Sequence, residues 1–337
     1  MRSSSGLSLL TNRAGYTAHF MDLTVWEPHI RKVCGLHGFG CEKVVPGVPG
    51  TFPTFIVEVG EEKAPISNIA IVVKFFGPLF DGTGSFNIER EIGRWLDAHP
   101  LSIVSPAILA DGMLDHDWQY LIFEYVGRVS IGQVRDKLSV NDWLSIAHQM
   151  GEYIHRFHAL TLDQQQELPR SIQPRMQKFT SFIKQQRVNC QANHQLWNDL
   201  PLHLVSQIEG FLLPLEQLID LTSLPHLIHA DLTADHILGC MGEGEWQTLA
   251  VIDWGDAMTG NLLYELVALH LELFHSDKNL LRACLEAYGL SRFYKHDFPR
   301  KAFSMVLLHQ FPMPAEVYAP FLEVKSLHEL AERLFAI

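Results

Sequence analysis

The spacing of hydrophobic and polar positions changes once along the chain, near residue 130. Before this point the apolar runs are short and separated by Gly, Pro and polar turns, which is typical of strands. The runs FIVEVG (55–60) and IAIVVKFFG (69–77) flank the polar segment EEKAPISN (61–68) and predict an antiparallel hairpin. After it, apolar residues recur at helical spacing over long segments, most clearly at 140–160.

Further elements surround the hairpin. Helices are predicted at 23–38 and at 85–99, the second with Ile88, Ile92, Trp95 and Leu96 on one face. Two more strands follow within SPAILADGML and WQYLIFEYVG, joined by the polar turn DHD. The order strand, strand, helix, strand, strand indicates a small α+β lobe.

Three parts of the chain are therefore predicted. Residues 1–20 form a flexible tail, residues 21–127 form the small α+β lobe, and residues 128–337 form a larger, mainly helical lobe. The predicted fold class is α+β, with an antiparallel sheet in the first lobe.

Composition and charge narrow the function. Among 337 residues, 47% are hydrophobic and 19% charged, which is ordinary for a globular protein. No apolar stretch reaches eighteen residues, so no membrane span is predicted. The segment MRSSSGLSLL has one Arg, a very short apolar part and no convincing cleavage site, so no secretory signal is predicted. The five scattered cysteines favour reduced thiols in a cytoplasmic protein. The net charge of −12 disfavours nucleic acid and anionic membranes, and it favours a cationic partner.

Chemistry-bearing side chains gather in HADLTADH, residues 229–236. Apolar pairs on both sides predict a polar loop held between two short strands. A third apolar segment, TLAVIDW, ends near Asp253. If the two loops lie side by side, then Asp231, His236 and Asp253 converge. Such a set is able to hold a divalent cation, and a carboxylate that is not coordinated accepts a proton.

These two segments resemble a known family, the aminoglycoside phosphotransferase-type kinases, which are distant relatives of protein kinases. HADLTADH is similar to the family's catalytic loop, and VIDWGDAMTGNLLYELVAL to its metal-binding segment and the helix after it. The hygromycin B kinase branch is closest by eye. The resemblance implies a two-lobed, protein kinase-like fold and ATP-dependent phosphorylation of a hydroxyl, with GTP as the alternative nucleotide.

The resemblance also implies roles for single residues. Asp231 is expected to accept the proton of the substrate hydroxyl, and Asp253 to bind Mg²⁺ on the nucleotide phosphates. His229 is expected to brace the loop. His236 stands where the family usually has a metal-binding Asn. Macrolide kinases of the same superfamily also carry His at this position. Because imidazole suits softer cations than Mg²⁺, Mn²⁺ is an alternative metal. Asn261 and Glu265 replace aspartates at structural positions.

The first lobe offers the matching nucleotide contacts. Lys74 lies in an apolar strand, where an unpaired ammonium is costly, and a kinase pairs this lysine with a helix Glu. Glu91 fits that position better than Glu89. The segment LIFEYVG is similar to the linker that binds adenine, through the Glu124 carbonyl and the Val126 amide. The segment PGVPGTFPT, which includes Thr51, lies where the phosphate-covering loop belongs but lacks a Gly-x-Gly-x-x-Gly pattern.

Alternatives stay open at this point. Asp231 and Asp253 are also able to cap loops or form turns. Lys74 is also consistent with an edge-strand lysine that keeps the sheet soluble. His236 is also consistent with a structural histidine in a loop. Two other functions compete: a pseudokinase-like binding protein, and a metal-dependent hydrolase that uses the histidines of the loop. A small-molecule acceptor with a hydroxyl is expected, with a cationic aminocyclitol as one candidate, and the chain is expected to be a monomer or homodimer.

Three further acidic residues have two readings. They either line an acidic substrate cleft or lie on a solvated helix face. They are Glu265, Glu272 and Asp277.

Overall fold

The computed structural model describes most of the chain, in two compact units. The described residues are 6–48, 50–60, 70–163, 167–220, 225–242, 244–290, 297–312, 319–321 and 323–337. The first unit comprises residues 1–100, 104–128 and 250–256, and the second comprises 101–103, 129–249 and 257–337. The expected turn EEKAPISN lies outside the described residues.

A five-stranded sheet forms the centre of the first unit, in the order β1-β2-β3-β5-β4 with every neighbouring pair antiparallel. The strands are β1 (Lys43–Pro46), β2 (Thr54–Glu58), β3 (Ala70–Phe76), β4 (Ile108–Asp115) and β5 (Trp118–Glu124). In the β2–β3 pair Thr54 lies opposite Lys74, so the predicted hairpin is confirmed.

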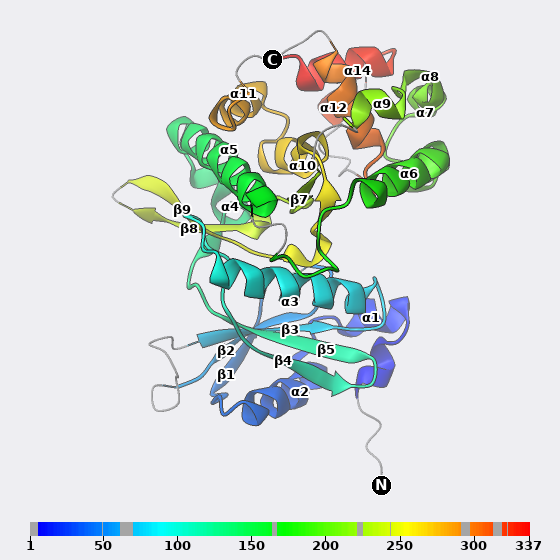
Figure 1. The fold of residues 1–337 in the computed structure, drawn as a ribbon. Coiled ribbons are helices and arrows are strands. Elements are labelled where there is room, and N and C mark those ends of the chain that lie inside the picture. The colour runs from blue at the N-terminus through cyan, green and yellow to red at the C-terminus, as the bar shows by residue number, and fades with distance from the viewer. Residues whose placement is uncertain are drawn as a thin grey trace. The chain divides into compact units, whose positions relative to one another are not determined.

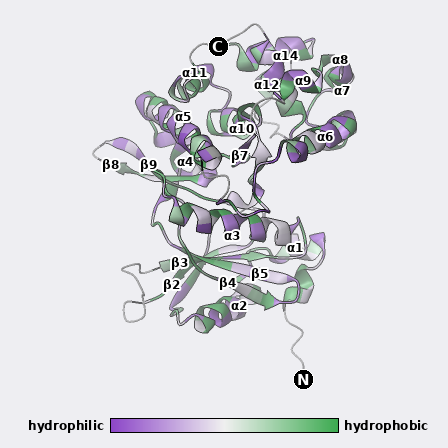
Figure 2. Ribbon diagram, in the orientation of Figure 1, coloured by the Kyte–Doolittle hydropathy of each residue, from purple (hydrophilic) through white to green (hydrophobic). Residues whose placement is uncertain are grey.

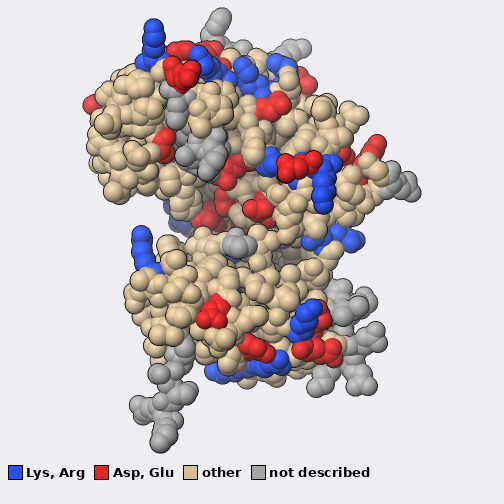
Figure 3. Space-filling model, turned by 180° about the vertical axis from the view of Figure 1, so that it is seen from behind, with Lys and Arg blue, Asp and Glu red and all other residues tan. Residues whose placement is uncertain are grey.

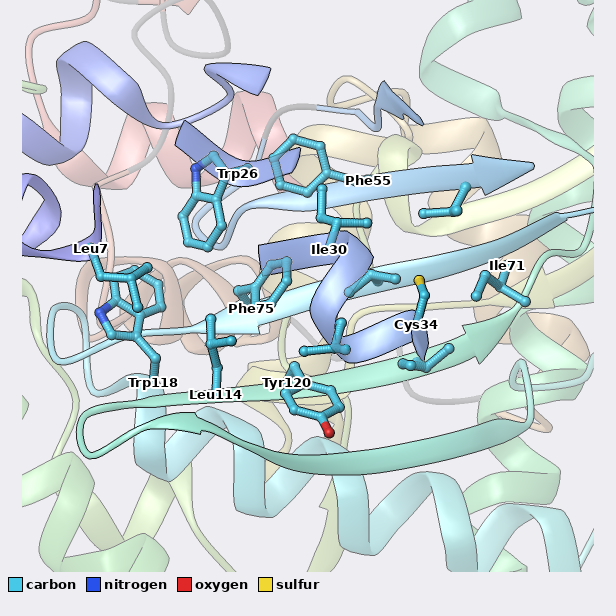
Figure 4. Packing of buried hydrophobic residues seen from close by; sticks show 14 of the residues in the cluster. Leu7, Trp26, Ile30, Cys34, Phe55, Ile71, Phe75, Leu114, Trp118 and Tyr120 are labelled. Atoms are coloured by element: carbon cyan, nitrogen blue, oxygen red, sulfur yellow. The ribbon is translucent and has the colours of Figure 1, made fainter. Parts of the chain in front are cut away.

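Two helices cover opposite faces of this sheet, α2 (Leu23–Leu36) and α3 (Gly82–Ala98) (Figure 1). Successive strand residues point to opposite faces, so β3 contributes to both cores. Phe75 packs against Trp26 of α2, with ring centroids 4.8 Å apart, and Figure 4 shows this cluster. Phe76 faces the other way and packs against Phe86 of α3. Lys74 therefore shares the α3 face.

The N-terminal segment corrects one prediction. Residues expected to form a flexible tail instead form η1 (Gly6–Leu10) and α1 (Arg13–His19). Leu7, Leu10 and Tyr16 are 4%, 0% and 6% exposed and belong to the same core as α2 and the sheet. Figure 4 shows Leu7 beside Trp118. A short apolar sequence without helical periodicity gave no sign of this docking, because its partners are distant in the sequence.

The second unit is mainly helical, as predicted. Its longest helices are α5 (Val140–Asp163) and α6 (Met176–Trp197), and both carry hydrophobic and hydrophilic residues along their length (Figure 2). The shorter helices are α4 (Ile131–Val134), α7 (Leu202–Val205), α8 (Ile208–Phe211), α9 (Leu215–Leu218), α10 (Leu262–Ala268), α11 (Lys278–Ala287), α12 (Phe298–Leu307) and α14 (Leu327–Phe335). None of the helices within the described residues is long and apolar enough to cross a membrane.

Short strands in this unit frame the expected catalytic loop. Strand β7 (His226–Ile228) pairs with β10 (Met258–Gly260), and β8 (Ile237–Gly242) lies between β6 (Val129–Ser130) and β9 (Glu245–Val251). The loop thus leaves one small sheet and enters another. The predicted arrangement of a polar loop between two short strands is confirmed.

Candidate active site

Lys74 is the centre of a buried ion cluster in the first unit. Its Nζ atom lies 2.8 Å from Glu89 Oε2 and 2.7 Å from Asp253 Oδ1. The lysine is 6% exposed. Burial alone would lower the pKa of Lys74, but the charges of Asp253 and Glu89 outweigh it and raise the pKa above its ordinary value. The lysine is therefore a permanent cation, so it is no edge-strand residue that serves only solubility.

Two aromatic rings flank this ammonium group. Nζ lies 5.8 Å from the ring centroid of Phe52 and 5.3 Å from that of Phe76. The two rings also contact each other, with centroids 4.9 Å apart. Rings at this distance attract a cation through their negative faces. They also restrict water around the cluster, which strengthens its electrostatic interactions.

The choice of Glu91 as the partner of Lys74 is wrong. Glu89 makes the ion pair and is 4% exposed, on the same helix face as Phe86 and Gly93. Two residues along an α-helix turn it by about 200°, so the helix cannot present both carboxylates to one lysine. Glu91 is only half-buried. The residue held as the fallback is therefore the partner.

Asp253 reaches the cluster from a distant part of the sequence. Its backbone is in the left-handed region, with φ of 64°, which is unusual for a residue other than glycine and is common at functional sites. Gly255 follows closely, and a Cβ there would lie 3.3 Å from Ser85 and 3.6 Å from both Asp253 Oδ1 and Glu89 Oε2. The segment thus packs tightly on α3. The Asp253 side chain is still 29% exposed.

Glu265 holds the expected catalytic loop, residues 229–236, in the second unit. This residue of α10 is 1% exposed, and it accepts hydrogen bonds from the backbone amides of His229, at 3.3 Å, and Ala230, at 2.9 Å. Burial raises the pKa of Glu265 to about 7, although the two amide hydrogen bonds oppose this rise. Ala230 has a positive φ of 68°. The buried carboxylate thus stabilises a strained turn immediately before Asp231, as expected for a structural position.

The two loop histidines have different hydrogen bonds. His229 is 1% exposed, and its Nδ1 accepts a hydrogen bond from the Asp231 amide at 3.3 Å, so it braces the loop as expected. His236 Nδ1 lies 2.7 Å from the carbonyl oxygen of Asp231, so this nitrogen donates. In the neutral ring the lone pair is then on Nε2. His236 Nδ1 also lies 3.4 Å from Asp231 Oδ2.

Two further carboxylates lie near the loop. Asp235 does not point toward His236 as a replacement ligand, since its Oδ1 accepts a hydrogen bond from Ser130 at 3.1 Å. Glu272 lies in the π-helical turn Leu269–Leu273. Burial raises the pKa of Glu272 to about 7, and the charge of Asp231 adds to the rise. Glu272 is therefore an electrostatic neighbour of Asp231.

Asp277 and Asn261 have structural roles. Asp277 caps α11, because its side chain accepts from the amides of Asn279 and Leu280. Asn261 caps α10 in the same way, through the amide of Tyr264, and its own amide group donates to the Leu218 carbonyl.

The predicted adenine linker follows β5. The backbone amide of Glu124 donates to the Ala107 carbonyl at 3.0 Å. The Glu124 carboxylate accepts a hydrogen bond from the Ala107 amide at 3.1 Å. The chain leaves the sheet after Glu124, so Val126 lies beyond the last paired residue. Thr51 lies in the segment that joins β1 to β2, and its carbonyl oxygen accepts from Tyr16 Oη at 2.7 Å.

Comparison with known proteins identifies the family. The model of the phosphotransferase enzyme family matches residues 52–300, which includes the ion cluster and the loop. The chain belongs to this family. It is a phosphotransferase, and the predicted enzyme class is confirmed.

Solved structures agree in fold. The wild-type aminoglycoside 2'-phosphotransferase-IIIa in complex with GDP matches with a TM-score of 0.65 and 15% identity, over 93% of this chain and 96% of that one. The APH(2")-IIIa complex with GDP and kanamycin gives 0.65 and 16%, over 90% and 95%. These likenesses show the kinase-like fold of the phosphotransferase.

A curated relative matches only in part. Lysine-specific demethylase JMJ21 from Arabidopsis thaliana is 23% identical over 211 residues, which are 52% of this chain and 22% of the relative. The chain therefore matches about a fifth of the length of this relative.

The metal ligands predicted for the phosphotransferase belong to different units, Asp253 to the first and His236 to the second. Within the described part of the chain, no group of three or more His, Cys, Asp or Glu side chains is arranged to hold a metal ion. Magnesium in phosphoryl-transfer sites is usually held by one or two protein side chains together with the phosphates. The roles of Asp253 and His236 as metal ligands therefore stay predictions.

Proposed function

We propose that this phosphotransferase moves the γ-phosphate of ATP, or of GTP, to a hydroxyl group of a small molecule. The observation that carries this proposal is the buried cluster of Lys74, Glu89 and Asp253. A cation fixed between two carboxylates has the position and charge needed to bind nucleotide phosphates. The Glu124 carbonyl and the Val126 amide hold the adenine, and the segment around Thr51 covers the phosphates.

Asp231 acts on the acceptor. Its carboxylate takes the proton of the acceptor hydroxyl as the oxygen of that hydroxyl bonds to the γ-phosphorus. The bond from this phosphorus to the β–γ bridging oxygen breaks, and ADP or GDP leaves with that oxygen. The Glu265 carboxylate and the His229 ring support this role, because both hold the backbone on the N-terminal side of Asp231. When bound, Mg²⁺ neutralises charge on the phosphates. Asp253 and His236 are the residues that would hold it.

We further propose a cationic acceptor, such as an aminoglycoside. Glu272 provides a second carboxylate beside Asp231, and the chain carries a net charge of −12. Acidic side chains are also exposed on the face in Figure 3, interspersed with basic ones. A similar fold binds kanamycin in the complex described above. The proposed compartment is the cytoplasm, where the five cysteines would stay free thiols, as all of them are in the described part of the chain.

The two competing functions fit less well. A metal-dependent hydrolase needs both loop histidines to bind one metal ion. His229 Nδ1, however, already accepts a hydrogen bond from the Asp231 amide. A pseudokinase needs no base, whereas the Asp231 side chain is 25% exposed, and its loop is held by hydrogen bonds to Glu265 and by others within the loop.

Phosphate transfer from ATP and from GTP to a panel of aminoglycosides and other alcohols tests the proposal. Asp231→Asn should lower kcat by about 10²–10⁴-fold while leaving the Kd for ATP within about twofold. Asp235→Asn is the matched control on the same loop and should change kcat by less than about threefold. Nucleotide binding without transfer to any acceptor would favour the pseudokinase, and full turnover by Asp231→Asn would exclude the proposed base.

A further inference from the structure

Tyr16 joins the N-terminal segment to the loop before β2. Its ring contacts Phe20 and Phe80, with centroid distances of 5.3 Å and 5.5 Å, and the residue is 6% exposed. Its hydroxyl reaches the carbonyl oxygen of Thr51 at 2.7 Å. A carbonyl oxygen only accepts, so the Tyr16 hydroxyl is the donor. Burial raises the pKa of Tyr16, which keeps this donor protonated at any working pH.

The segment that carries Tyr16 is fixed to the first unit. Asn12 caps α1 through the amide of Gly15. A Cβ at Gly15 would lie 1.8 Å from the carbonyl oxygen of Leu9, so η1 and α1 pack with no spare room. Arg13 lies over the Phe80 ring at 5.6 Å. Tyr16 therefore extends from a rigid support.

The loop on the other side of this hydrogen bond leads to the ion cluster. At its base the amide of Gly47 donates to the Thr54 carbonyl at 2.8 Å, and Thr54 Oγ1 donates to the Phe52 carbonyl at 3.0 Å. Phe52 directly follows Thr51, and its ring lies 5.8 Å from Lys74 Nζ. A shift of Thr51 would move this ring and with it the cover of the lysine.

We propose that Tyr16 is a positioning residue for the nucleotide site: its hydrogen bond to Thr51 fixes residues 50–54 and keeps Phe52 over Lys74. This inference rests on the proposed function, since it assigns the phosphates to Lys74. Fixing the loop before the nucleotide arrives reduces the entropy that binding must overcome, which increases affinity. It also gives the N-terminal segment a role in nucleotide binding.

The test compares Tyr16→Phe with Tyr120→Phe. Both changes remove one buried tyrosine hydroxyl from the first unit, but the Tyr120 hydroxyl pairs with His37 Nε2 at 2.9 Å and does not contact the loop. Amide hydrogen exchange is measured without nucleotide, and the Kd for ATP is measured by calorimetry. Tyr16→Phe should exchange faster in residues 50–56 and bind ATP about 3- to 10-fold more weakly, with kcat within about twofold. Tyr120→Phe should change neither quantity.

Each outcome decides the matter. If the wild type binds ATP and both variants bind it equally well, the positioning role is overturned while the proposed function stands. Equal exchange in the two variants overturns it as well. If the wild type binds neither ATP nor GTP, the proposed function fails and this inference fails with it. A similar loss of thermal stability in both variants, with weaker ATP binding in Tyr16→Phe alone, supports the proposal.

Discussion

Replacing Glu89 by Gln tests the ion cluster most directly. The change keeps the size and shape of the side chain and removes its charge, 2.8 Å from Lys74 Nζ. Lys74 would keep a single carboxylate partner, Asp253, at 2.7 Å. Glu91→Gln is the matched control, because it removes the same charge from the same helix two residues away. The comparison separates the structural assignment from the one favoured by sequence.

The size of the effect follows from the geometry. At 2.8 Å and an effective dielectric constant of about 20, the gross attraction between Glu89 and Lys74 is about 6 kcal/mol. Desolvation of both ions offsets most of this, and Gln still accepts a hydrogen bond. The unfolding free energy should therefore fall by about 1.5–3 kcal/mol, the usual value of one hydrogen bond to a charged group. The midpoint temperature should fall by roughly 3–12 °C.

Urea and thermal unfolding followed by circular dichroism measure this loss, and calorimetry with ATP measures its effect on binding. Since the net effect on Lys74 is a raised pKa, its contribution is fully present below the unfolded value of about 10.4 and is lost only above it. The difference between wild type and Glu89→Gln should thus be constant between about pH 6 and 9. An equal or larger loss in Glu91→Gln, or no loss in Glu89→Gln, would refute the assignment.

Three further predictions concern other parts of the protein. The folded-state pKa of Glu272 is about 7, above its unfolded value, so the folded state holds more protons between the two values and its stability should fall as pH rises through this window. The unfolding free energy of the wild type should fall by about 1–2 kcal/mol over this window, after allowance for solvent screening. Urea titrations at several pH values should show a smaller fall in Glu272→Gln. Equal slopes of unfolding free energy against pH in the two proteins would contradict this prediction. His236→Asn should lower the ratio of Mn²⁺- to Mg²⁺-supported turnover, because imidazole suits softer cations; an unchanged ratio would leave His236 a structural residue. Leu10→Ala should cost about 2–4 kcal/mol in urea unfolding, since Leu10 is fully buried, whereas a flexible tail would show no change.

The sequence by itself determined the local elements and the motifs. Strand β3 and helix α3 follow from the spacing of their apolar residues, which local geometry fixes regardless of the rest of the chain. The loop HADLTADH between apolar pairs, and the segment that ends at Asp253, indicated the family that the comparison then showed. Each of these features lies within one short stretch of sequence, so the sequence is enough to identify it without the three-dimensional structure.

Only the tertiary structure decided which side chains meet. The phase of α3 against the sheet selects Glu89 instead of Glu91, and a difference of two residues is too small for apolar spacing to resolve. The burial of Leu10 and Tyr16 depends on residues far along the chain, so no local pattern reports it. The same is true of Asp253, which reaches Lys74 across 179 positions, and of Glu265, which binds loop amides 35 and 36 positions away. Packing over such separations is set by the whole fold, because each contact depends on elements that the intervening sequence brings together.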